Sequence, residues 1–177
     1  IVRHMAEQIA IKLESELLNG TSGKAEGVLS TSNTVTASDK DSITLADLIK
    51  LQSSIKQSFQ ANACWTMHPE TFTAIKLLTD AHGRPLIEPD VTQSFPYRLL
   101  GKNVYLSENM PKITAESKSI LYGDYSGLSI NFRENISIEI LREKYATKHA
   151  IGVVAWFEFD SKITDEQKLA VLVHPAS

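Results

Sequence analysis

The sequence contains a single cysteine, Cys64, so no disulfide can form within the chain. This excludes the small disulfide-stapled scaffolds and is typical of proteins from a reducing compartment. Long hydrophobic runs are also lacking, because none approaches the roughly 20 apolar residues of a membrane-spanning helix, and no membrane partner is expected. Neither sign of charge dominates: 18 Lys and Arg against 21 Asp and Glu leave a net charge of −3, a poor match to a protein that grips nucleic acid.

Enough chain is present to bury a real core, since 177 residues with 42% hydrophobic and 22% charged side chains are typical of one or two globular domains. Catalytic signatures, in contrast, are lacking. The glycine-rich stretch 20–27 follows a predicted helix, not a strand, and lacks the Gly-Lys-Ser/Thr ending of a phosphate loop. We therefore interpret it as a flexible connection and predict no catalytic, cofactor-binding or metal-binding residues.

One cysteine–histidine pair, Cys64 and His68, has a spacing that could supply two zinc ligands or a nucleophile and its base. The second half of a zinc site is missing, and a cysteine inside an apolar strand usually behaves as a small hydrophobe with a raised pKa. Packing and capping roles are therefore favoured over a zinc site. A small hydrolase using Cys64 and His68 remains as an alternative of a different functional class.

Charged residues gather in three places that we interpret as solvated turns, caps and a strand edge. The aspartates of the first two groups stand in hydroxyl-rich loops, which favours turn and cap roles over a metal site. The third group is basic and is balanced by Glu139 and Glu143. The groups are Asp39, Asp41 and Asp47; Asp160 and Asp165; and Arg142, Lys144 and Lys148.

Residues 1–18 form a predicted amphipathic helix, with Met5, Ile9, Leu13 and Leu17 at four-residue spacing. The helix should end at Asn19-Gly20, where glycine can take the left-handed conformation of a C-terminal cap. No capping residue precedes it and the sequence does not begin with Met. We therefore expect these 177 residues to be the C-terminal part of a longer protein.

The remaining periodicity predicts a mixture of helices and strands. Thr44 and Asp47 stand at capping-box spacing, and the alternation of apolar and polar residues over 128–140 predicts a strand with one buried and one wet face, interrupted at 134–135. The expected elements are a loop over 19–44 with a short strand at 28–29, helices over 44–60 and from Pro69 to Leu78, and strands over 63–67, 103–107, 119–123, 128–140, 150–159 (central and buried) and 168–173.

Several stretches, in this order along the chain, resemble one family, the major capsid proteins of tailed bacteriophages of the Hong Kong 97 type. Each is a pattern of turns and strands, and together they span nearly the whole chain. They are Leu17-Leu18-Asn19-Gly20-Thr21 with Gly23-Lys24 and Glu26-Gly27-Val28-Leu29; Trp65-Thr66-Met67-His68-Pro69-Glu70-Thr71-Phe72 continuing through Leu77-Leu78-Thr79-Asp80 and Gly83-Arg84-Pro85-Leu86; Leu99-Leu100-Gly101, Val104, Met110-Pro111 and Leu121-Tyr122-Gly123-Asp124-Tyr125; and Ile130, Arg133, Ile136, Ile138, Glu143, Tyr145-Ala146, Val153, Ala155 and Asp160.

The resemblance implies an α+β fold of the Hong Kong 97 type, with an axial domain whose mixed sheet is flanked by helices. It also implies a peripheral domain, residues 1–19 and 124–148, in which the end of a long spine helix packs on a 128–145 hairpin; residues 20–123 and 149–177 would form the axial domain. His68 stands where Asn is usual in the family, which puts the helix cap there in question, and Asn135 where Gly is common. The family's N-terminal arm and extended loop have no counterpart here.

In function, the resemblance implies a structural subunit of a phage or prophage capsid and no enzyme activity. Copies of the chain would assemble into pentamers and hexamers around the genome, with scaffolding or portal proteins as further partners and the DNA enclosed without specific binding. The expected location is the virion, with assembly in the bacterial cytoplasm. The related alternative is the shell protein of an encapsulin-like compartment.

Overall fold

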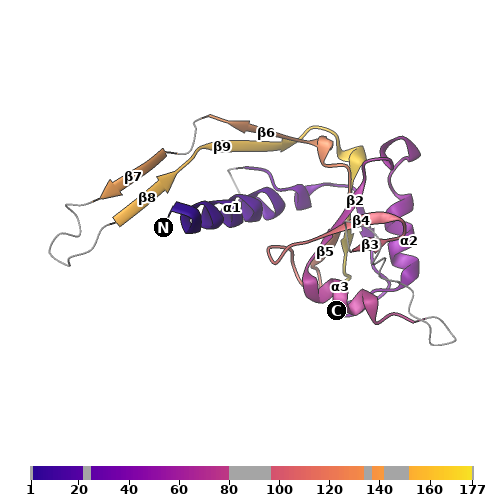
Figure 1. Cartoon of the computed structure of the whole chain (residues 1–177). Coiled ribbons are helices and arrows are strands. Elements are labelled where there is room, and N and C mark those ends of the chain that lie inside the picture. Colours follow the sequence, from indigo (N-terminus) through magenta and orange to yellow (C-terminus); the bar gives the residue numbers. More distant parts are fainter. Residues whose placement is uncertain (1, 22–24, 80–96, 134–136, 142–151, 177) are drawn as a thin grey trace.

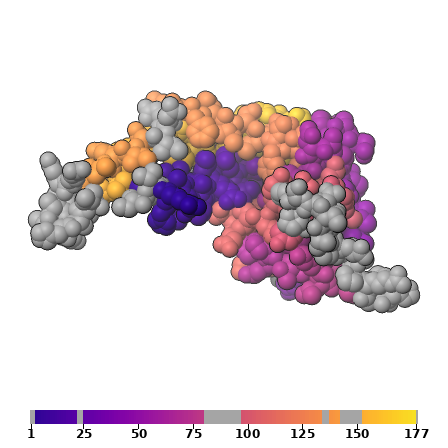
Figure 2. Space-filling model, in the orientation of Figure 1, coloured from indigo at the N-terminus to yellow at the C-terminus, as the bar shows by residue number. Residues whose placement is uncertain are grey.

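A six-stranded mixed sheet occupies one end of the molecule, and a long projection of one helix and paired strands extends from it (Figure 1). This computed structural model describes residues 2–21, 25–79, 97–133, 137–141 and 152–176. We call the six-stranded sheet with its covering helices the body, and the projection, made of residues 2–19, 128–141 and 152–163, the arm. The space-filling view shows the helix of the arm lying along its strands (Figure 2).

The sheet of the body has the strand order β1-β10-β5-β2-β4-β3. β1 runs parallel to β10 and β2 parallel to β4, while the other neighbours are antiparallel. The sheet is therefore mixed, as expected. Its strands are β1 (Thr34–Thr36), β2 (Cys64–Met67), β3 (Arg98–Leu99), β4 (Lys102–Leu106), β5 (Lys118–Gly123) and β10 (Leu169–Val173).

Apolar residues cover both faces of the central strands. In β5, Ile120 and Tyr122 belong to a cluster with Trp65, and Leu121 points into a second cluster with Val28. Burial on both faces explains why these strands read as continuous apolar runs. The first cluster is covered by α2 (Leu45–Ser53) and α3 (Pro69–Lys76), and the second by the end of α1 (Val2–Asn19) and the 3₁₀ turn η1 (Val28–Ser30).

Helix α2 begins where the sequence predicts, with a complete capping box in which the Thr44 side chain accepts from the Asp47 N–H. The predicted end at residue 60 is wrong, because the helix stops at Ser53. The Ser53 and Ser54 hydroxyls bond to backbone carbonyls of the last turn, and the Gln60 side-chain amide donates to Gln52 O (2.7 Å). Side chains thus satisfy the carbonyls that a longer helix would have used, and the 3₁₀ turn η2 (Gln57–Phe59) follows.

Helix α3 has His68 as its N-terminal cap, at the position where the resemblance left the cap in question. The imidazole Nδ1 of His68 accepts a hydrogen bond from the Glu70 N–H (3.0 Å), so histidine caps this helix as asparagine would. Pro69 occupies the first helical position. The other helix terminus predicted from glycine is confirmed too, since Gly20 has a φ of +71° directly after α1.

The predicted 128–145 hairpin is wrong, because its two strands pair with other strands. β6 (Leu128–Phe132) pairs antiparallel with β9 (Phe159–Ile163), and β7 (Ser137–Leu141) pairs with β8 (Gly152–Trp156). β6 and β7 are therefore successive lengths along one side of a ribbon, not partners of each other. Period-two alternation identifies a strand but not the strand with which it pairs, and the interruption predicted at 134–135 falls outside the described residues.

Two further strand predictions are wrong. The pair Val28-Leu29 lies in the 3₁₀ turn η1, not a strand, and the stretch 150–159 does not form one central strand. Its described part contains β8 and the start of β9, in a two-stranded ribbon where Trp156 is 58% exposed. Apolar sequence alone cannot distinguish a strand buried by its own chain from one that is left exposed. The strands near 63–67, 103–107, 119–123 and 168–173 are confirmed as β2, β4, β5 and β10.

No helix in the described part of the chain is long and apolar enough to cross a membrane.

Candidate functional site

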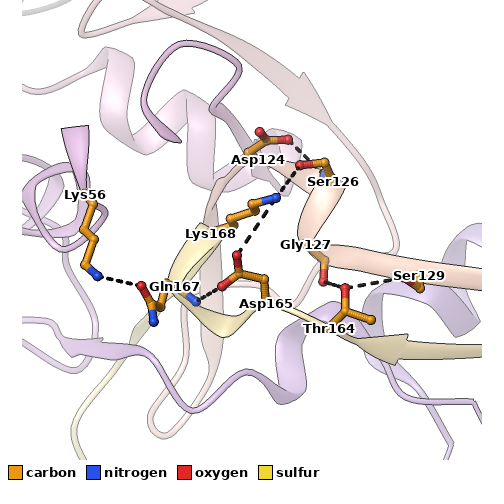
Figure 3. A network of polar contacts seen from close by, with 9 residues as sticks. All are labelled: Lys56, Asp124, Ser126, Gly127, Ser129, Thr164, Asp165, Gln167 and Lys168. Atoms are coloured by element: carbon orange, nitrogen blue, oxygen red, sulfur yellow. Dashed lines mark hydrogen bonds and ion pairs between the residues drawn. The ribbon is translucent and has the colours of Figure 1, made fainter. Parts of the chain in front are cut away.

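Three chain segments connect the body with the arm, and we call the region where they meet the junction. Strand β5 of the body is followed by β6 of the arm through the 3₁₀ turn η3 (Tyr125–Gly127), and β9 of the arm is followed by β10 of the body through η5 (Glu166–Lys168). The third connection, from α1 to η1, contains Glu26 and Gly27. Figure 3 shows the first two connections and the polar contacts between them.

The turns η3 and η5 are built in the same way. In η3 the Asp124 carboxylate accepts from the Ser126 N–H (2.9 Å), and in η5 the Asp165 carboxylate accepts from the Gln167 N–H (3.1 Å). The Asp124 N–H also donates to the Lys168 carbonyl (2.9 Å), which joins the two turns directly. Each aspartate thus shapes one connection (Figure 3), and the backbone bond from Asp124 to Lys168 holds the connections side by side.

Glycines let the two connections approach each other backbone to backbone. The Gly127 carbonyl accepts from both the N–H (2.8 Å) and the hydroxyl (3.0 Å) of Thr164. A Cβ added to Gly123 would lie 2.2 Å from the Lys168 carbonyl oxygen, and one added to Gly127 would lie 2.8 Å from the Asp165 carbonyl oxygen. Real Cβ atoms do not approach backbone so closely, so both positions require glycine.

The third connection is bound to the edge of β9. The Glu26 N–H donates to Ser161 O (2.9 Å), the Ser161 hydroxyl donates to Glu26 O (2.8 Å), and the Ile163 N–H donates to the Glu26 carboxylate (3.2 Å). Next to it, a Cβ on Gly27 would lie 2.3 Å from Gly20 N. These bonds occupy hydrogen-bonding groups along one edge of β9 and fasten the end of α1 to the ribbon.

An apolar groove of about 550 Å³ separates α1 from the body beside the junction. Tyr125 lies in its wall with its hydroxyl 2.5 Å from the Thr66 hydroxyl. Burial raises the pKa of Tyr125, with hydrogen bonding to Thr66 opposing that shift. The groove is lined by Ala10, Leu13, Glu14, Leu17, Leu18, Val28, Cys64, Thr66, Tyr105, Tyr125, Leu128 and Ile130.

The second feature of the arm is its exposed apolar surface. Ile130 and Phe132 from β6, Ile138 and Ile140 from β7, and Trp156 from β8 are 42% to 58% exposed. The sequence predicted one buried face for residues 128–140; in the described part of that stretch Leu128 is partly buried against the core, while Ile130, Phe132, Ile138 and Ile140 are exposed. Trp156 is the cross-strand partner of Ser137, so it points to the opposite face of the β7–β8 pair from Ile138 and Ile140. Exposed apolar residues gathered on one projection mark a contact surface for another molecule. We call these five residues the arm surface.

Cys64 lies in β2 and His68 at the start of α3. Burial, and secondarily the nearby Asp124 carboxylate, raise the pKa of the Cys64 thiol to about 11, so the thiol stays protonated at neutral pH. His68 is buried and uses Nδ1 to cap α3. Among the described residues, no group of three or more His, Cys, Asp or Glu is placed to hold a metal ion.

The aspartates singled out by sequence lie in turns and caps. Asp39 accepts from the Ser42 hydroxyl (3.0 Å), and this bond, with that from the Asp41 N–H, holds the pKa of Asp39 below its usual range. Asp47 belongs to the capping box and Asp165 caps η5. The Asp160 carboxylate accepts from the Ser161 N–H (2.9 Å). The basic group Arg142, Lys144 and Lys148 lies outside the described residues.

Sequence reasoning missed the junction, although local signals for its turns exist. Asp124 and Asp165 each precede, by two residues, the backbone N–H that they cap, which is the spacing of an Asx turn. Gly123 and Gly127 flank the first of these turns. What the sequence does not show is that two turns 41 residues apart, at Asp124 and Asp165, meet in space.

Comparison with known proteins gives a consistent result. The model of the phage capsid family matches residues 1–174, whereas no curated protein matches the chain significantly. Among solved structures, the capsid of an empty GTA particle has a TM-score of 0.79 at 22% identity, covering 99% of this chain and 67% of that one. The structure titled Gordonia phage Cozz has a TM-score of 0.70 at 12% identity, covering 99% of this chain and 62% of the other.

A compartment protein has the same fold. The encapsulin of the holo-SrpI complex from Synechococcus elongatus PCC 7942 has a TM-score of 0.71 at 20% identity, covering 97% of this chain and 63% of that one. At these identities the likenesses establish the fold, which is that of the Hong Kong 97-like capsid proteins, as predicted. This chain spans about two thirds of the length of these solved chains.

Proposed function

This chain belongs to the phage capsid family, and on that premise we propose that it is a structural subunit of an icosahedral phage or prophage capsid. Copies of the subunit assemble into pentamers and hexamers that enclose the genome. The observation that carries this proposal is the arm surface, five large apolar side chains that remain exposed on a long projection. Another copy of the chain is the partner that the family implies.

The mechanism is physical association and requires no chemical step. In a closed shell, contacts between unlike patches of neighbouring subunits close into rings. Each contact can be weak, because many contacts act together in one particle. An arm that projects from a compact body gives each subunit a long reach over its neighbours, and apolar residues at the contact supply the free energy of association.

Further parts of this proposal concern partners, location and domains. Scaffolding and portal proteins are additional partners, DNA is enclosed without specific binding, in line with the net charge of −3, and assembly takes place in the bacterial cytoplasm before the subunit resides in the virion. We propose a peripheral domain of residues 1–19 and 124–148 and an axial domain of 20–123 and 149–177. The pairing of β8 and β9 with β7 and β6 supports moving residues 152–163 into the peripheral domain.

Negative-stain electron microscopy of the full-length gene product tests the proposal. We expect closed shells or ring-shaped capsomers, and fewer of them when Phe132 and Ile140 of the arm surface are both changed to Ser. Ile49→Ser is the matched control, because Ile49 is a half-exposed isoleucine on α2 of the body. A full-length protein that stays strictly monomeric under assembly conditions would show that the proposal is wrong.

The second candidate function is the shell of an encapsulin-like compartment that holds cargo enzymes in place of a genome, and the likeness to the SrpI encapsulin favours keeping it. The gene neighbourhood separates the two. Portal, protease and terminase genes beside this one indicate a phage or prophage, while a cargo-enzyme gene indicates a compartment. The content of purified particles, nucleic acid or protein, gives the same distinction directly.

A hydrolase using Cys64 and His68 is not part of this proposal, because the thiol is protonated at neutral pH and the imidazole nitrogen Nδ1 is occupied by a backbone N–H. Replacing both residues by alanine should leave assembly intact. Loss of a measurable turnover in that double variant would instead support the hydrolase.

A further inference from the structure

The side chain of Lys168 lies where the two strand connections of the junction meet (Figure 3). Its ammonium nitrogen is 3.1 Å from the Ser126 hydroxyl in η3 and 4.0 Å from the Asp165 carboxylate that caps η5. It also stands 5.5 Å from the centre of the Phe59 ring, which belongs to η2 in the body. With 22% of its surface exposed, the side chain is largely enclosed by these partners.

We propose that Lys168 is a positioning residue that holds the arm at one angle to the body. One ammonium group contacts the connection that leads into β6, the connection that returns from β9, and the body itself. The Asp165 contact lies within η5, but if the arm turned about the junction, the contacts with Ser126 and with the Phe59 ring could not both be kept. The angle of the arm with these contacts intact is therefore favoured over its alternatives.

The charges at the junction strengthen this argument. Two carboxylates, Asp124 and Asp165, cap the adjoining turns, and Lys168 supplies a cation between the two connections. The pKa of Asp124 is held below its usual range, first by the hydrogen bond from the Ser126 backbone and further by the charge of Lys168.

Backbone contacts limit where this movement can occur. Gly123 and Gly127 are packed against the opposite connection, so the two connections cannot slide past each other. The remaining freedom is a rotation of both turns together relative to the body. A second side-chain tie crosses the same gap, because the Lys56 ammonium donates to the Gln167 side-chain oxygen (2.6 Å). Lys56 reaches only η5, so it serves as a matched control cation.

The consequence for the shell rests on the proposed function. If arms contact neighbouring subunits, the angle between arm and body fixes the angle at which subunits meet, and thereby the curvature of the shell. Lys168 then determines shell size without itself lying on the arm surface.

The experiment measures the arm angle directly in this chain, independently of assembly. Nitroxide labels are attached at Ile11→Cys on α1 and Leu77→Cys at the end of α3, both exposed, in a Cys64→Ser background, and pulsed electron paramagnetic resonance gives the distance distribution. We expect one narrow distribution in the reference protein. Lys168→Met should broaden or shift it, Lys168→Arg should restore it, and Lys56→Met, which removes only the tie to η5, should change it less than Lys168→Met does.

A purely structural role for Lys168 would lower the unfolding temperature without altering the distribution of the folded protein. An unchanged distribution in Lys168→Met, or a broad one in the reference protein, would overturn the proposal. If Lys168→Met does not fold, Lys168→Gln, which keeps a polar side chain and removes the charge, takes its place under the same criteria.

The shell consequence is tested separately with the full-length product. Lys168→Met particles should show a wider spread of diameters in micrographs than wild-type particles, with Lys168→Arg matching the wild type. A wild-type protein that forms no particles but has a narrow distance distribution would contradict the proposed function and leave the role of Lys168 standing. Normal diameters in Lys168→Met particles would refute the link to curvature.

Discussion

The body and the arm contain similar apolar strands that meet opposite environments. In the body, Leu121 of β5 and Leu172 of β10 are completely buried, and Trp65 packs against Tyr122 with ring centres 4.3 Å apart. In the arm, Trp156 is 58% exposed. The inner strands of the six-stranded sheet, such as β5 and β10, have neighbours on both edges, whereas each strand of a two-stranded ribbon has only one neighbour.

This difference teaches where each region obtains its stability. The body buries its apolar side chains within one chain and obtains its stability from that burial. A two-stranded ribbon is marginal in isolation and needs packing against another element. In this chain α1 and Glu26 supply part of that packing, and the arm surface is left for partners. Substitutions in the two regions should therefore affect different measurements.

Trp65→Ala should have the largest effect on stability. The Trp65 ring is fully buried and its indole N–H donates to Leu99 O (2.9 Å). We expect a loss of about 3–5 kcal/mol in the free energy of unfolding, because a large cavity and an unpaired carbonyl remain. Urea denaturation followed by circular dichroism measures it. A loss below about 1 kcal/mol would contradict the description of the body as the stable region.

Gly123→Ala should have the next largest effect, at the boundary of the two regions. Its Cβ would lie 2.2 Å from Lys168 O, so the backbone must shift, at an expected cost of about 1–3 kcal/mol in unfolding free energy. Gly101→Ala is the control, because a Cβ added to Gly101 would meet no other atom within 4 Å, although the φ of +78° is unfavourable for alanine. Its cost should be limited to conformational strain of about 1 kcal/mol. Thermal unfolding of both variants checks this order.

Asp47→Asn should show a smaller effect that depends on pH. Burial by itself would raise the pKa of Asp47, but hydrogen bonds from Ser38 (2.6 Å) and Thr44 outweigh it and hold the pKa below its usual value of 3.8. A depressed pKa in the folded state stabilises the body above about pH 4, and this contribution is lost as the pH falls through the folded value.

For Asp47→Asn we expect a loss of about 0.5–2 kcal/mol at pH 7, typical of a lost helix cap, and a weaker loss of stability on acidification than in the wild type. Unfolding midpoints in urea at pH 7 and pH 3 measure both quantities. If the variant and the wild type lose stability equally between these pH values, Asp47 does not carry the proposed share.

Trp156→Ala should have the smallest effect on the chain itself and a clear effect on its association. Because Trp156 is 58% exposed, we expect less than about 0.5 kcal/mol of change in unfolding free energy. The yield of capsomers or shells from the full-length protein should nevertheless fall. A tryptophan that stabilises the isolated chain as strongly as Trp65 would remove the distinction between body and arm.

Patterns of neighbouring residues were enough to predict where several helices begin or end. The capping box at Thr44, the proline at the start of α3 and the glycine after α1 each set a helix terminus. The end of α2 was not predictable in this way, since it depends on Gln60 folding back onto the helix. The pairing of β6 with β9 was also not predictable, because the paired residues are far apart along the chain. Their separation rises from 27 positions for Phe132↔Phe159 to 35 for Leu128↔Ile163.

For the candidate site, too, some features could be predicted from the sequence and others needed the folded structure. From sequence, the stretches resembling the capsid family indicated the kind of protein, and the family match confirms it. The same sequence favoured packing and capping roles for Cys64 and His68, and the structure places Cys64 in β2 and His68 at the cap of α3. It did not indicate Lys168 as a functional residue, because a lysine gains its significance from Ser126, Asp165 and Phe59, which only the folded chain places around it.

By itself, the sequence determined the type of most elements, the family and the positions of turns, because those depend on side chains close to one another along the chain. Only the tertiary structure decided which strands pair and which apolar residues stay exposed. Burial depends on layers contributed by distant segments: Ile130 and Phe132 in β6 are consistent with a core or a surface until the fold shows that they lie in a two-stranded ribbon and stay exposed.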